Sequence, residues 1–511
     1  MLLLDLSGTA GSRKHRKTLN MTIFRKYAGV IYSKQIHRFL FLLVLLFNSA
    51  LKAEANELPE LGDRATQYLS PQKEKEIGQS FLRRLIRNTD YVTDHELKHY
   101  LQKIGDQVAR SADLRGVELV FNLIGSNELN AFAVPGGYIT FNTGLLLNTE
   151  RESELASVVA HEIAHLSQRH LPRLIARSQD NKLPTTAAII GSILIGGQAG
   201  LAGLTLTNAQ LLSNQLRYTR DFEREADAVG IQLLSNAGFD PFAMTQFFNK
   251  LERYSRTKGS STPEFLRTHP LSYSRIAETE QRAQQLPKVD HANSLEYHLV
   301  RAKIQALYSS DRIDPVLYFE KQTSDLPARE LIAAKYGLAT ALAEERHYSE
   351  AEKILAPLIA DAPQNHYFQI LQASIEESSG RGTEAIERLT RLSERNPELH
   401  FVVYYLASTL LSSGNAEEAK KVTRYHLRRR ANDYQLYRLL SRINVELGQI
   451  PEAHQADAEY HALLGDNQRA IASLKLALRD NKEEGYFSSS VAARLKELEN
   501  KRSISGELQF E

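Results

Sequence analysis

The sequence contains no cysteine and no tryptophan among its 511 residues. Without cysteine the chain can form no disulfide, iron–sulfur cluster, thiolate zinc site or thiol nucleophile, so a bound metal must be held by His, Asp or Glu. Sixteen histidines are available for this role. An excess of one charge is also absent, since 63 Lys plus Arg face 61 Asp plus Glu. The net charge of +2 therefore gives no electrostatic reason to expect a nucleic-acid partner.

The amino-terminal apolar run is short. Phe39–Phe47 has nine residues, whereas a bilayer crossing takes about 20. Eight Lys or Arg precede the run within residues 1–38, and small residues follow at Ala53 and Ala55. This layout predicts a secretory signal peptide over residues 1–55, cleaved after Ala55 or after Ala53, with residues 1–20 as an extension in front of the true start. A buried helix or an uncleaved amphipathic anchor is the alternative.

A HExxH motif is the strongest chemical signal in the sequence. His161, Glu162 and His165 lie in a segment whose apolar residues recur at helical spacing. Two histidines four positions apart lie on the same face of a helix, so both rings can reach one Zn²⁺. Glu162 is turned about 100° from His161 and can act on a water at the metal without ligating the metal. The motif predicts a zinc hydrolase and leaves the third ligand open.

Two downstream segments offer a third ligand. The metzincin continuation is absent because position 168 is Gln, and His170 would lie on a different helical face, so we expect a surface or core histidine there. Glu223 is the better candidate and shares a helix face with Asp227. Carboxylates at this spacing repel unless a positive charge lies near them. We expect Glu223 to complete a His₂Glu site and Asp227 to hold a ligating histidine; a solvated charged helix is the alternative.

These motifs carry a family resemblance. HEIAH at residues 161–165 followed by EREAD at residues 223–227 resembles the zinc metallopeptidase family that includes the CAAX prenyl protease and the bacterial heat-shock membrane protease. Residues 130–139 resemble the family's segment before the active-site helix, and residues 267–270 resemble its carboxyl-terminal Thr-His-Pro element. The resemblance covers about residues 60–285.

The resemblance implies a set of site residues. Its zinc ligands, for one Zn²⁺ per chain, are His161, His165 and Glu223. In metal-assisted amide hydrolysis Glu162 would take a proton from water and pass it to the leaving amine, and Asp227 matches the Asp of the family's ExxxD pattern. For periplasmic members with repeats, the resemblance supports His269 as a self-inhibitory fourth ligand. Arg275 is expected either to stabilise the tetrahedral oxyanion or to form a surface ion pair.

The first domain, residues 56–287, is expected to be an α+β zincin-like metallopeptidase, mostly helical with a small antiparallel sheet. Val117–Ile124 and Gly137–Phe141 are β-rich runs separated by a turn signal, which predicts an antiparallel pair. An exposed strand edge near the metal can hold an extended peptide by main-chain hydrogen bonds. We predict that substrate contacts Ala133, Val134, Pro135, Gly136 and Gly137. A simple turn at these residues is the alternative.

Residues 183–216 contain no charged residue and are interrupted by glycines. In membrane-embedded relatives the matching region is transmembrane, but the polar residues and glycines here argue against a stable span. We expect a flap that covers the active-site cleft or contacts a membrane surface. A buried helical hairpin is the alternative.

A 34-residue period begins after residue 287. Alanines recur at 351, 385, 419 and 453, and glycines recur at 380, 414 and 448. Ala339, Ala373 and Ala407 take the small position of the first helix in each unit. This pattern predicts an all-α tetratricopeptide solenoid over residues 288–500, followed by a tail at 501–511. A half-period at Gly465 and Ala470 lets the helices there pair with either neighbour.

The export signal, zinc peptidase and solenoid together resemble periplasmic family members that act on outer-membrane proteins. This resemblance implies a protease and chaperone-like factor for unfolded or misassembled β-barrel proteins, with the repeats binding the outer-membrane assembly machinery and with peripheral membrane contact. A scaffold with a vestigial peptidase domain and a general periplasmic quality-control protease are the alternatives. Because cysteine is absent, we expect noncovalent packing between the two halves to leave their interface free to move.

Overall fold

The computed structural model describes residues 66–180 without 68, 209–257, 263–309, 313–322, 326–482 and 485–507. The predicted signal peptide and residues 183–208 of the predicted flap lie outside this part of the chain. The last eight flap residues begin helix α10, which runs over Ala209–Asn236. Of the helices that the structure describes, none is both long and apolar enough to cross a bilayer.

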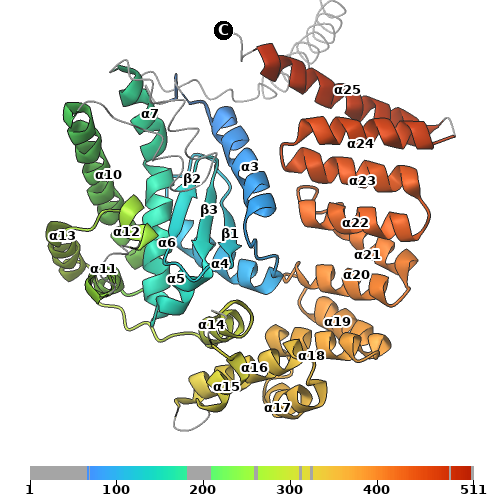
Figure 1. The fold of residues 1–511 in the computed structure, drawn as a ribbon, viewed down its shortest axis with the longest axis horizontal. Coiled ribbons are helices and arrows are strands. Elements are labelled where there is room, and N and C mark those ends of the chain that lie inside the picture. Colours follow the sequence, from blue (N-terminus) through green and yellow to red (C-terminus); the bar gives the residue numbers. More distant parts are fainter. Residues whose placement is uncertain are drawn as a thin grey trace, which may run out of the picture. The chain divides into compact units, whose positions relative to one another are not determined.

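The peptidase region consists of helices around a small sheet (Figure 1). Its strands are β1 (Val120–Ile124), β2 (Ala131–Val134) and β3 (Tyr138–Asn142). Its helices besides α10 are α3 (Pro71–Asn88), α4 (His95–Ala109), α5 (Thr143–Asn148), α6 (Glu152–Ser167), α7 (His170–Asp180), α11 (Phe242–Thr257), α12 (Glu264–Thr268) and α13 (Tyr273–Gln284).

Helices alone make up the described part of the second region, so the predicted fold class is confirmed: a mostly helical domain with a small sheet precedes a helical repeat solenoid. These helices are α14 (Leu295–Tyr308), α15 (Pro315–Glu320), α16 (Ala328–Glu344), α17 (Tyr348–Asp361), α18 (His366–Ser378), α19 (Gly382–Arg395), α20 (Val402–Ser412), α21 (Ala416–Leu427), α22 (Tyr434–Glu446), α23 (Ile450–Leu463), α24 (Asn467–Asp480) and α25 (Tyr486–Glu507).

The sheet is mixed, which corrects the predicted antiparallel pair. β3 lies between the other two strands, parallel to β1 and antiparallel to β2. The turn at residues 135–137 joins β2 to β3 as a hairpin, and β1 reaches β3 only through the longer connection that contains β2. The prediction is wrong because this four-residue strand takes the hairpin position that was assigned to β1. As a result β2 is an edge strand of the sheet.

Two glycines make the β2–β3 turn possible. Gly136 and Gly137 have φ angles of +87° and +89°, where a side chain is strained. A Cβ on Gly136 would lie 2.7 Å from the carbonyl oxygen of Glu74 in α3, and one on Gly137 would lie 2.1 Å from that of Glu118. The turn therefore packs directly against the backbone of α3 and of the segment before β1.

Helix α6 runs through the core of the peptidase region. Leu155, Val158 and Ile163 are buried, and the helix packs against α4, α10, α11 and β2. At its amino terminus the buried carboxylate of Glu152 accepts hydrogen bonds from the backbone and hydroxyl of Ser294, each at 2.8 Å. A carboxylate at this end of a helix is favoured by the helix dipole. The start of α6 is thus fixed by the linker that leads to the repeats.

The repeat helices follow the predicted period. The alanines at the predicted small positions are all buried: Ala339, Ala351, Ala373, Ala385, Ala407, Ala419 and Ala453. Gly380, Gly414 and Gly448 have φ angles of +81°, +79° and +69°, and Arg346 takes the equivalent position one repeat earlier with φ +65°. Helix α23 packs against both α22 and α24, as the half-period allows.

Residues Arg64–Glu511 form one compact unit. The repeats contact the peptidase region at both ends and also between them, where His95 of α4 packs on Tyr404 of α20 and Tyr91 bonds to Tyr434 of α22. At the near end, one hydrophobic core continues from α4 and α6 into α18 and includes Tyr297, Tyr336 and Tyr367. Lys303 of α14 also pairs there with Asp94 at 2.6 Å, next to the amino terminus of α4. This shared core argues against a freely moving interface at the near end.

At the far end the contact is both polar and apolar. Arg83 of α3 donates a hydrogen bond to the carbonyl of Leu464 at 2.8 Å, and Arg87 pairs with Asp466 at 2.8 Å. The side chain of Leu464 joins a cluster with Ile77 of α3. The loop between α23 and α24 is thus attached to the helix that supports the β2–β3 turn.

Replacing Gly137 by alanine tests the packing of this turn. The matched control is Gly238→Ala, because Gly238 has φ +82° but nothing within 4 Å of an added Cβ. We expect the control to cost about 1–2 kcal/mol and to lower the melting temperature by a few degrees. Gly137→Ala adds a clash with the backbone, so its decrease should be at least twice as large. Equal decreases would contradict the close packing.

Two half-buried histidines, His95 of α4 and His366 of α18, should make stability depend on pH. Burial lowers the pKa of each to about 3, against about 6.5 in an unfolded chain. The folded state then binds fewer protons, so stability is lost as pH falls from about 6.5 towards 3, by up to about 1.4 kcal/mol per pH unit and histidine. We expect the double variant His95→Phe, His366→Phe to lose less unfolding free energy than the wild type between about pH 7 and pH 5. Equal losses in urea titrations would contradict this.

Candidate metal centre

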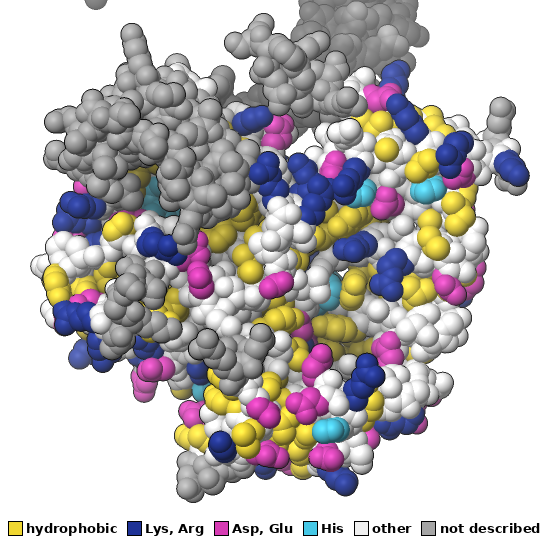
Figure 2. Space-filling view, in the orientation of Figure 1, with side chains coloured by type: hydrophobic (Ala, Val, Ile, Leu, Met, Phe, Trp, Pro, Cys, Tyr) yellow, Lys and Arg dark blue, Asp and Glu magenta, His cyan; other side chains and the backbone are white. Residues whose placement is uncertain are grey.

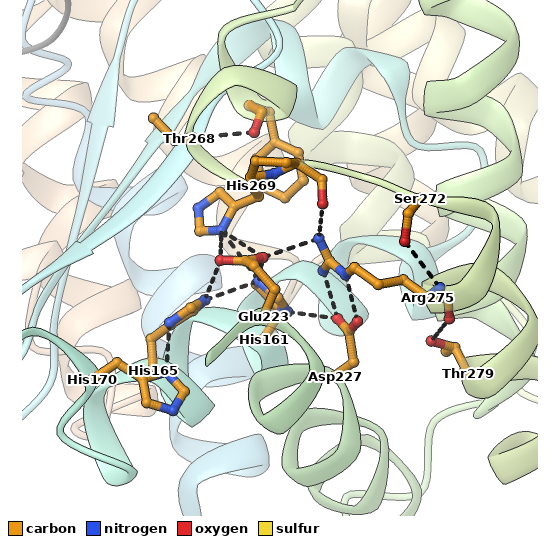
Figure 3. A network of polar contacts seen from close by, with 12 residues as sticks. His161, His165, His170, Glu223, Asp227, Thr268, His269, Ser272, Arg275 and Thr279 are labelled. Carbon is orange, nitrogen blue, oxygen red and sulfur yellow. Dashed lines mark hydrogen bonds and ion pairs between the residues drawn. The ribbon is translucent and has the colours of Figure 1, made fainter. Parts of the chain in front are cut away.

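Four ligand-type side chains meet at one point beside α6 (Figure 3). Helix α6 carries His161 and His165, α10 carries Glu223, and His269 directly follows α12. One ligand atom from each of the four lies within 4.8 Å of the other three. The structure therefore brings together all four residues that the sequence indicates as metal ligands.

The atoms that face this point are nitrogens and carboxylate oxygens. Nε2 of His161 and Nε2 of His165 lie 3.0 Å apart. Glu223 Oε1 lies 3.4 Å from His165 Nε2 and 3.1 Å from His269 Nδ1. The distance from His161 Nε2 to His269 Nδ1 is 3.3 Å. This set of donors, without sulfur, suits Zn²⁺ in a catalytic site.

A glycine lets α10 approach α6 closely enough to bring in Glu223. A Cβ on Gly230 would lie 3.2 Å from the carbonyl oxygen of Ala160 and from the backbone nitrogen of His161. Glu223 lies seven positions before Gly230, two turns along the same helix face. The close crossing therefore places the carboxylate opposite the HExxH motif.

His269 is presented by the end of a short helix. Its backbone nitrogen donates to the carbonyl of Phe265 at 2.7 Å, and the two rings lie 4.8 Å apart. Phe265 is itself tied to the segment before β2, because its backbone nitrogen donates to Leu129 at 3.1 Å. His269 is buried with Nδ1 towards the metal centre.

Glu162 is a buried carboxylate beside the ligand set. Its side chain is 1% exposed, and Oε1 has no hydrogen-bond partner in the part of the chain that the structure describes, although His269 Nε2 lies 3.5 Å from it. Burial raises the pKa of Glu162 above its usual range, while His269, His161 and the backbone of Ala133 oppose this shift. A buried oxygen without a partner costs free energy. Its environment therefore fits a water and a metal ion at the neighbouring ligands.

Asp227 and Arg275 contact the ligand-type residues on the side away from the metal centre. Asp227 Oδ1 lies 3.1 Å from Nδ1 of His161, the ring nitrogen that faces away from the metal centre. Arg275 donates to both oxygens of Asp227 at 2.7 and 2.8 Å, to the carbonyl of Pro270 at 2.7 Å, and pairs with Glu223 at 3.1 Å. Arg275 is 3% exposed, so the alternative of a surface ion pair is wrong.

The charges around the centre shift its pKa values in opposite directions. Burial lowers the pKa of His161, but Asp227 and Glu223 outweigh burial and raise it to about 10. For His165, burial dominates and holds the pKa well below its usual value. Burial would raise the pKa of Glu223, yet His269 and His165 hold it well below the usual range. Since a metal ligand must be a neutral ring, metal and proton compete at His161.

One of the five predicted substrate residues lies beside the carboxylate of Glu162. The backbone of Ala133 faces Glu162. The carbonyl of Asn130 accepts a hydrogen bond from the backbone nitrogen of Asn142 at 3.0 Å, so Asn130 faces β3. In an antiparallel pair the residues that bond to the partner strand alternate with residues that do not. The backbone groups of Ala131 and Ala133 therefore point to the free edge of β2. Val134 is buried against α3, and residues 135–137 form the turn.

His170 is the functional candidate that sequence reasoning missed. Its ring is buried, with Nδ1 2.8 Å from Nδ1 of His165. The expected different helical face is wrong, because α6 ends at Ser167 and Arg169 adopts φ +51° before α7 begins. The chain turns there, and the ring of His170 folds back onto His165. No glycine or asparagine at positions 168–169 signals the turn.

Comparison with known proteins agrees with this geometry. The profile of Peptidase family M48 matches residues 95–283, which include the four ligand-type residues. The mitochondrial metalloendopeptidase OMA1 of Arabidopsis thaliana is 30% identical over 162 residues, which cover 32% of this chain and 31% of that protein. This relative therefore matches only part of the chain.

Two bacterial relatives match both regions. The beta-barrel assembly-enhancing protease of Escherichia coli (strain K12) is 33% identical over 461 residues, covering 88% of this chain and 92% of that protein. The putative beta-barrel assembly-enhancing protease of Vibrio cholerae serotype O1 is 33% identical over 419 residues, covering 81% of this chain and 86% of that protein. With these matches and the site in place, the chain belongs to the beta-barrel assembly-enhancing proteases of peptidase family M48.

Proposed function

We propose that the chain is a zinc-dependent metalloendopeptidase, exported to the periplasm, that degrades misassembled outer-membrane β-barrel proteins and assists the assembly of others. The observation that supports this most is the buried ligand set next to the carboxylate of Glu162, whose Oε1 has no hydrogen-bond partner among the described residues and lies 3.5 Å from His269 Nε2. The proposed metal ligands are His161, His165 and Glu223. The chain would hold one Zn²⁺.

The residues around the site have distinct roles in the proposed amide hydrolysis. Zn²⁺, when bound, would polarise the scissile carbonyl and lower the pKa of water. Glu162, whose pKa burial raises, is suited to take a proton from water and deliver it to the leaving amine. Asp227 would hold the ring of His161, and Arg275 would hold Asp227 and Glu223. The donors of Arg275 are engaged by these groups, which favours a supporting role over oxyanion binding.

The substrate would bind as an additional strand on the free edge of β2. Backbone groups of Ala131 and Ala133 are directed to this edge, and Ala133 lies beside Glu162. A strand added there gains main-chain hydrogen bonds that do not depend on its sequence. This mode of binding suits a protease for extended, unfolded chains.

His269 would keep the enzyme latent. Its Nδ1 lies 3.1 Å from Glu223 and 3.3 Å from His161, within reach of the same ion. A fourth protein ligand would occupy the position that catalysis requires for water. Activity would then require His269 to leave the centre when substrate binds.

The proposed substrates and partners follow from the relatives and from the repeats. The relatives' names refer to β-barrel assembly, and the solenoid gives a surface of the type that binds protein segments. We infer that the repeats bind the outer-membrane assembly machinery. The uncharged residues 183–216 would allow peripheral membrane contact. A complete ligand set disfavours the alternative of a scaffold with a vestigial peptidase.

Glu162→Gln tests the catalytic role. The amide cannot accept a proton, so we expect cleavage of an unfolded outer-membrane protein to fall by about 10²–10⁴-fold while zinc content stays unchanged. Glu150→Gln is the matched control, because Glu150 is exposed shortly before α6. Cleavage is followed by gel, and zinc is measured on the same samples. Equal cleavage by wild type and Glu162→Gln, or a wild type without zinc, would refute the enzyme proposal.

His269→Ala tests latency. Removing a fourth ligand opens a coordination position, so we expect cleavage of the same substrate to rise several-fold. The exposed His347, replaced by alanine, serves as the control. Melting temperatures of both variants separate a gain in activity from loosened folding. Unchanged or lower cleavage by a His269→Ala protein that melts like the wild type would contradict an inhibitory role.

A further inference from the structure

We propose that His170 is a positioning residue for the metal centre, which selects the tautomer of His165 and holds its ring. This inference rests on the proposed zinc site. His170 Nδ1 lies 2.8 Å from His165 Nδ1, on the opposite side of the ring from the nitrogen that faces the ligand set. Its side chain is 5% exposed. The contact is therefore shielded from competing water.

The proton positions follow from the geometry. His165 turns Nε2 to the metal centre, and a ligating nitrogen must have a free lone pair, so the proton of a neutral ring is on Nδ1. His165 Nδ1 then donates to His170 Nδ1, which must accept. The remaining proton of neutral His170 is on Nε2, which makes no hydrogen bond within the described residues but lies 3.4 Å from Glu225 Oε2, so this link is electrostatic. Each nitrogen along this path has one consistent role.

An arginine is the last residue of this series of contacts. Arg173 of α7 donates to both oxygens of Glu225 at 3.0 Å. The ring of His170 stacks on Phe222 with 4.6 Å between centroids and 17° between planes. Phe222 immediately precedes Glu223, so the same segment of α10 supplies a metal ligand and the surface that orients His170.

The turn before α7 is built to place His170. Arg169 adopts φ +51°, a conformation that costs a non-glycine residue about 1–2 kcal/mol. Its guanidinium offsets this cost by pairing with Glu74 at 2.6 Å and donating to the carbonyl of Leu69 at 3.1 Å. The strained residue thus lies directly before the proposed positioning residue and is held by α3.

Both histidines of helix α6 are supported by a chain of polar residues, but the two chains differ in chemistry. His161 is backed by Asp227 and then Arg275, whereas His165 is backed by His170, Glu225 and then Arg173. Residues that support metal-ligating histidines in this way typically change metal affinity by about 10–100-fold when replaced.

Zinc affinity of the full chain, measured by chelator competition, tests the proposal. His170→Phe keeps a ring that can stack on Phe222 but has no acceptor, so we expect zinc to bind about 10–100-fold more weakly. His170→Gln offers an amide oxygen as acceptor and should recover part of the loss. Glu225→Gln should lose less than His170→Phe, and His347→Phe is the control. Melting of each metal-free protein reports on folding separately.

The outcomes distinguish this inference from the proposed function. A wild type that does not bind zinc refutes the proposed function. A wild type that binds zinc, together with His170→Phe of equal affinity, overturns the positioning role. Equal losses in His170→Phe and His170→Gln, accompanied by lower melting temperatures of both metal-free variants, would also overturn it in favour of plain structural support. If His170→Phe does not fold, the zinc affinities of His170→Gln and Glu225→Gln still test the proposal. Zinc affinity equal to that of the wild type in both variants refutes it.

Discussion

The close packing of α6 against α10 is the constraint on which the rest of the structure depends. Helix α6 carries His161 and Glu162 into a core where they are 2% and 1% exposed. Ionisable groups buried this deeply cost free energy unless they are paired. Helix α10 supplies Glu223 and Asp227 from the opposite side, and Gly230 lets the two backbones come close enough. The metal centre and its electrostatics both follow from this crossing (Figure 3).

The residue pairs of the candidate site could be recognised from local spacing, whereas His269 was indicated by the family resemblance. Residues at i and i+4 share a helix face wherever that helix lies, so His161 with His165 and Glu223 with Asp227 could be paired from the sequence. The 34-residue period is visible for a similar reason, since each repeat places the same small residues at the same helix contacts. Such features need no knowledge of the tertiary structure.

The features that could not be predicted from the sequence depend on the direction of the backbone or on residues far apart in the chain. The four-residue strand β2 is too short to be recognised by alternation, and missing it reverses the direction assigned to β1 and β3. His170 was placed on a continuing helix, but the helix ends two residues before Arg169 takes a left-handed conformation without glycine. The burial of Arg275 depends on Asp227, 48 positions away, and no local pattern reveals such a pair.

The two attachments of the repeats differ in how they can respond to a partner. The near end shares the hydrophobic core of α4 and α6, so separating it would expose apolar surface at a large cost in free energy. The far end combines the apolar contact of Leu464 with polar contacts of Arg83 and Arg87 of α3, and the polar contacts exchange more readily with water. Figure 2 shows Lys and Arg side chains gathered on this face of the molecule. Because α3 also supports the β2–β3 turn, the more easily separated end of the solenoid contacts the element beside the edge strand.

The two histidines of helix α6 are held by supports of different charge, and this difference affects their basicity. Asp227 is anionic and, with Glu223, raises the pKa of His161 to about 10 against the effect of burial. His170 is a neutral ring, and burial dominates at His165, whose pKa stays well below its usual value. A charged support strengthens a histidine as a ligand but also makes it hold a proton, whereas a neutral support leaves the ring ready to bind without losing one. The site therefore combines one histidine that must release a proton to bind a metal with one whose low pKa favours the neutral ring, and this difference follows from the groups that contact each ring.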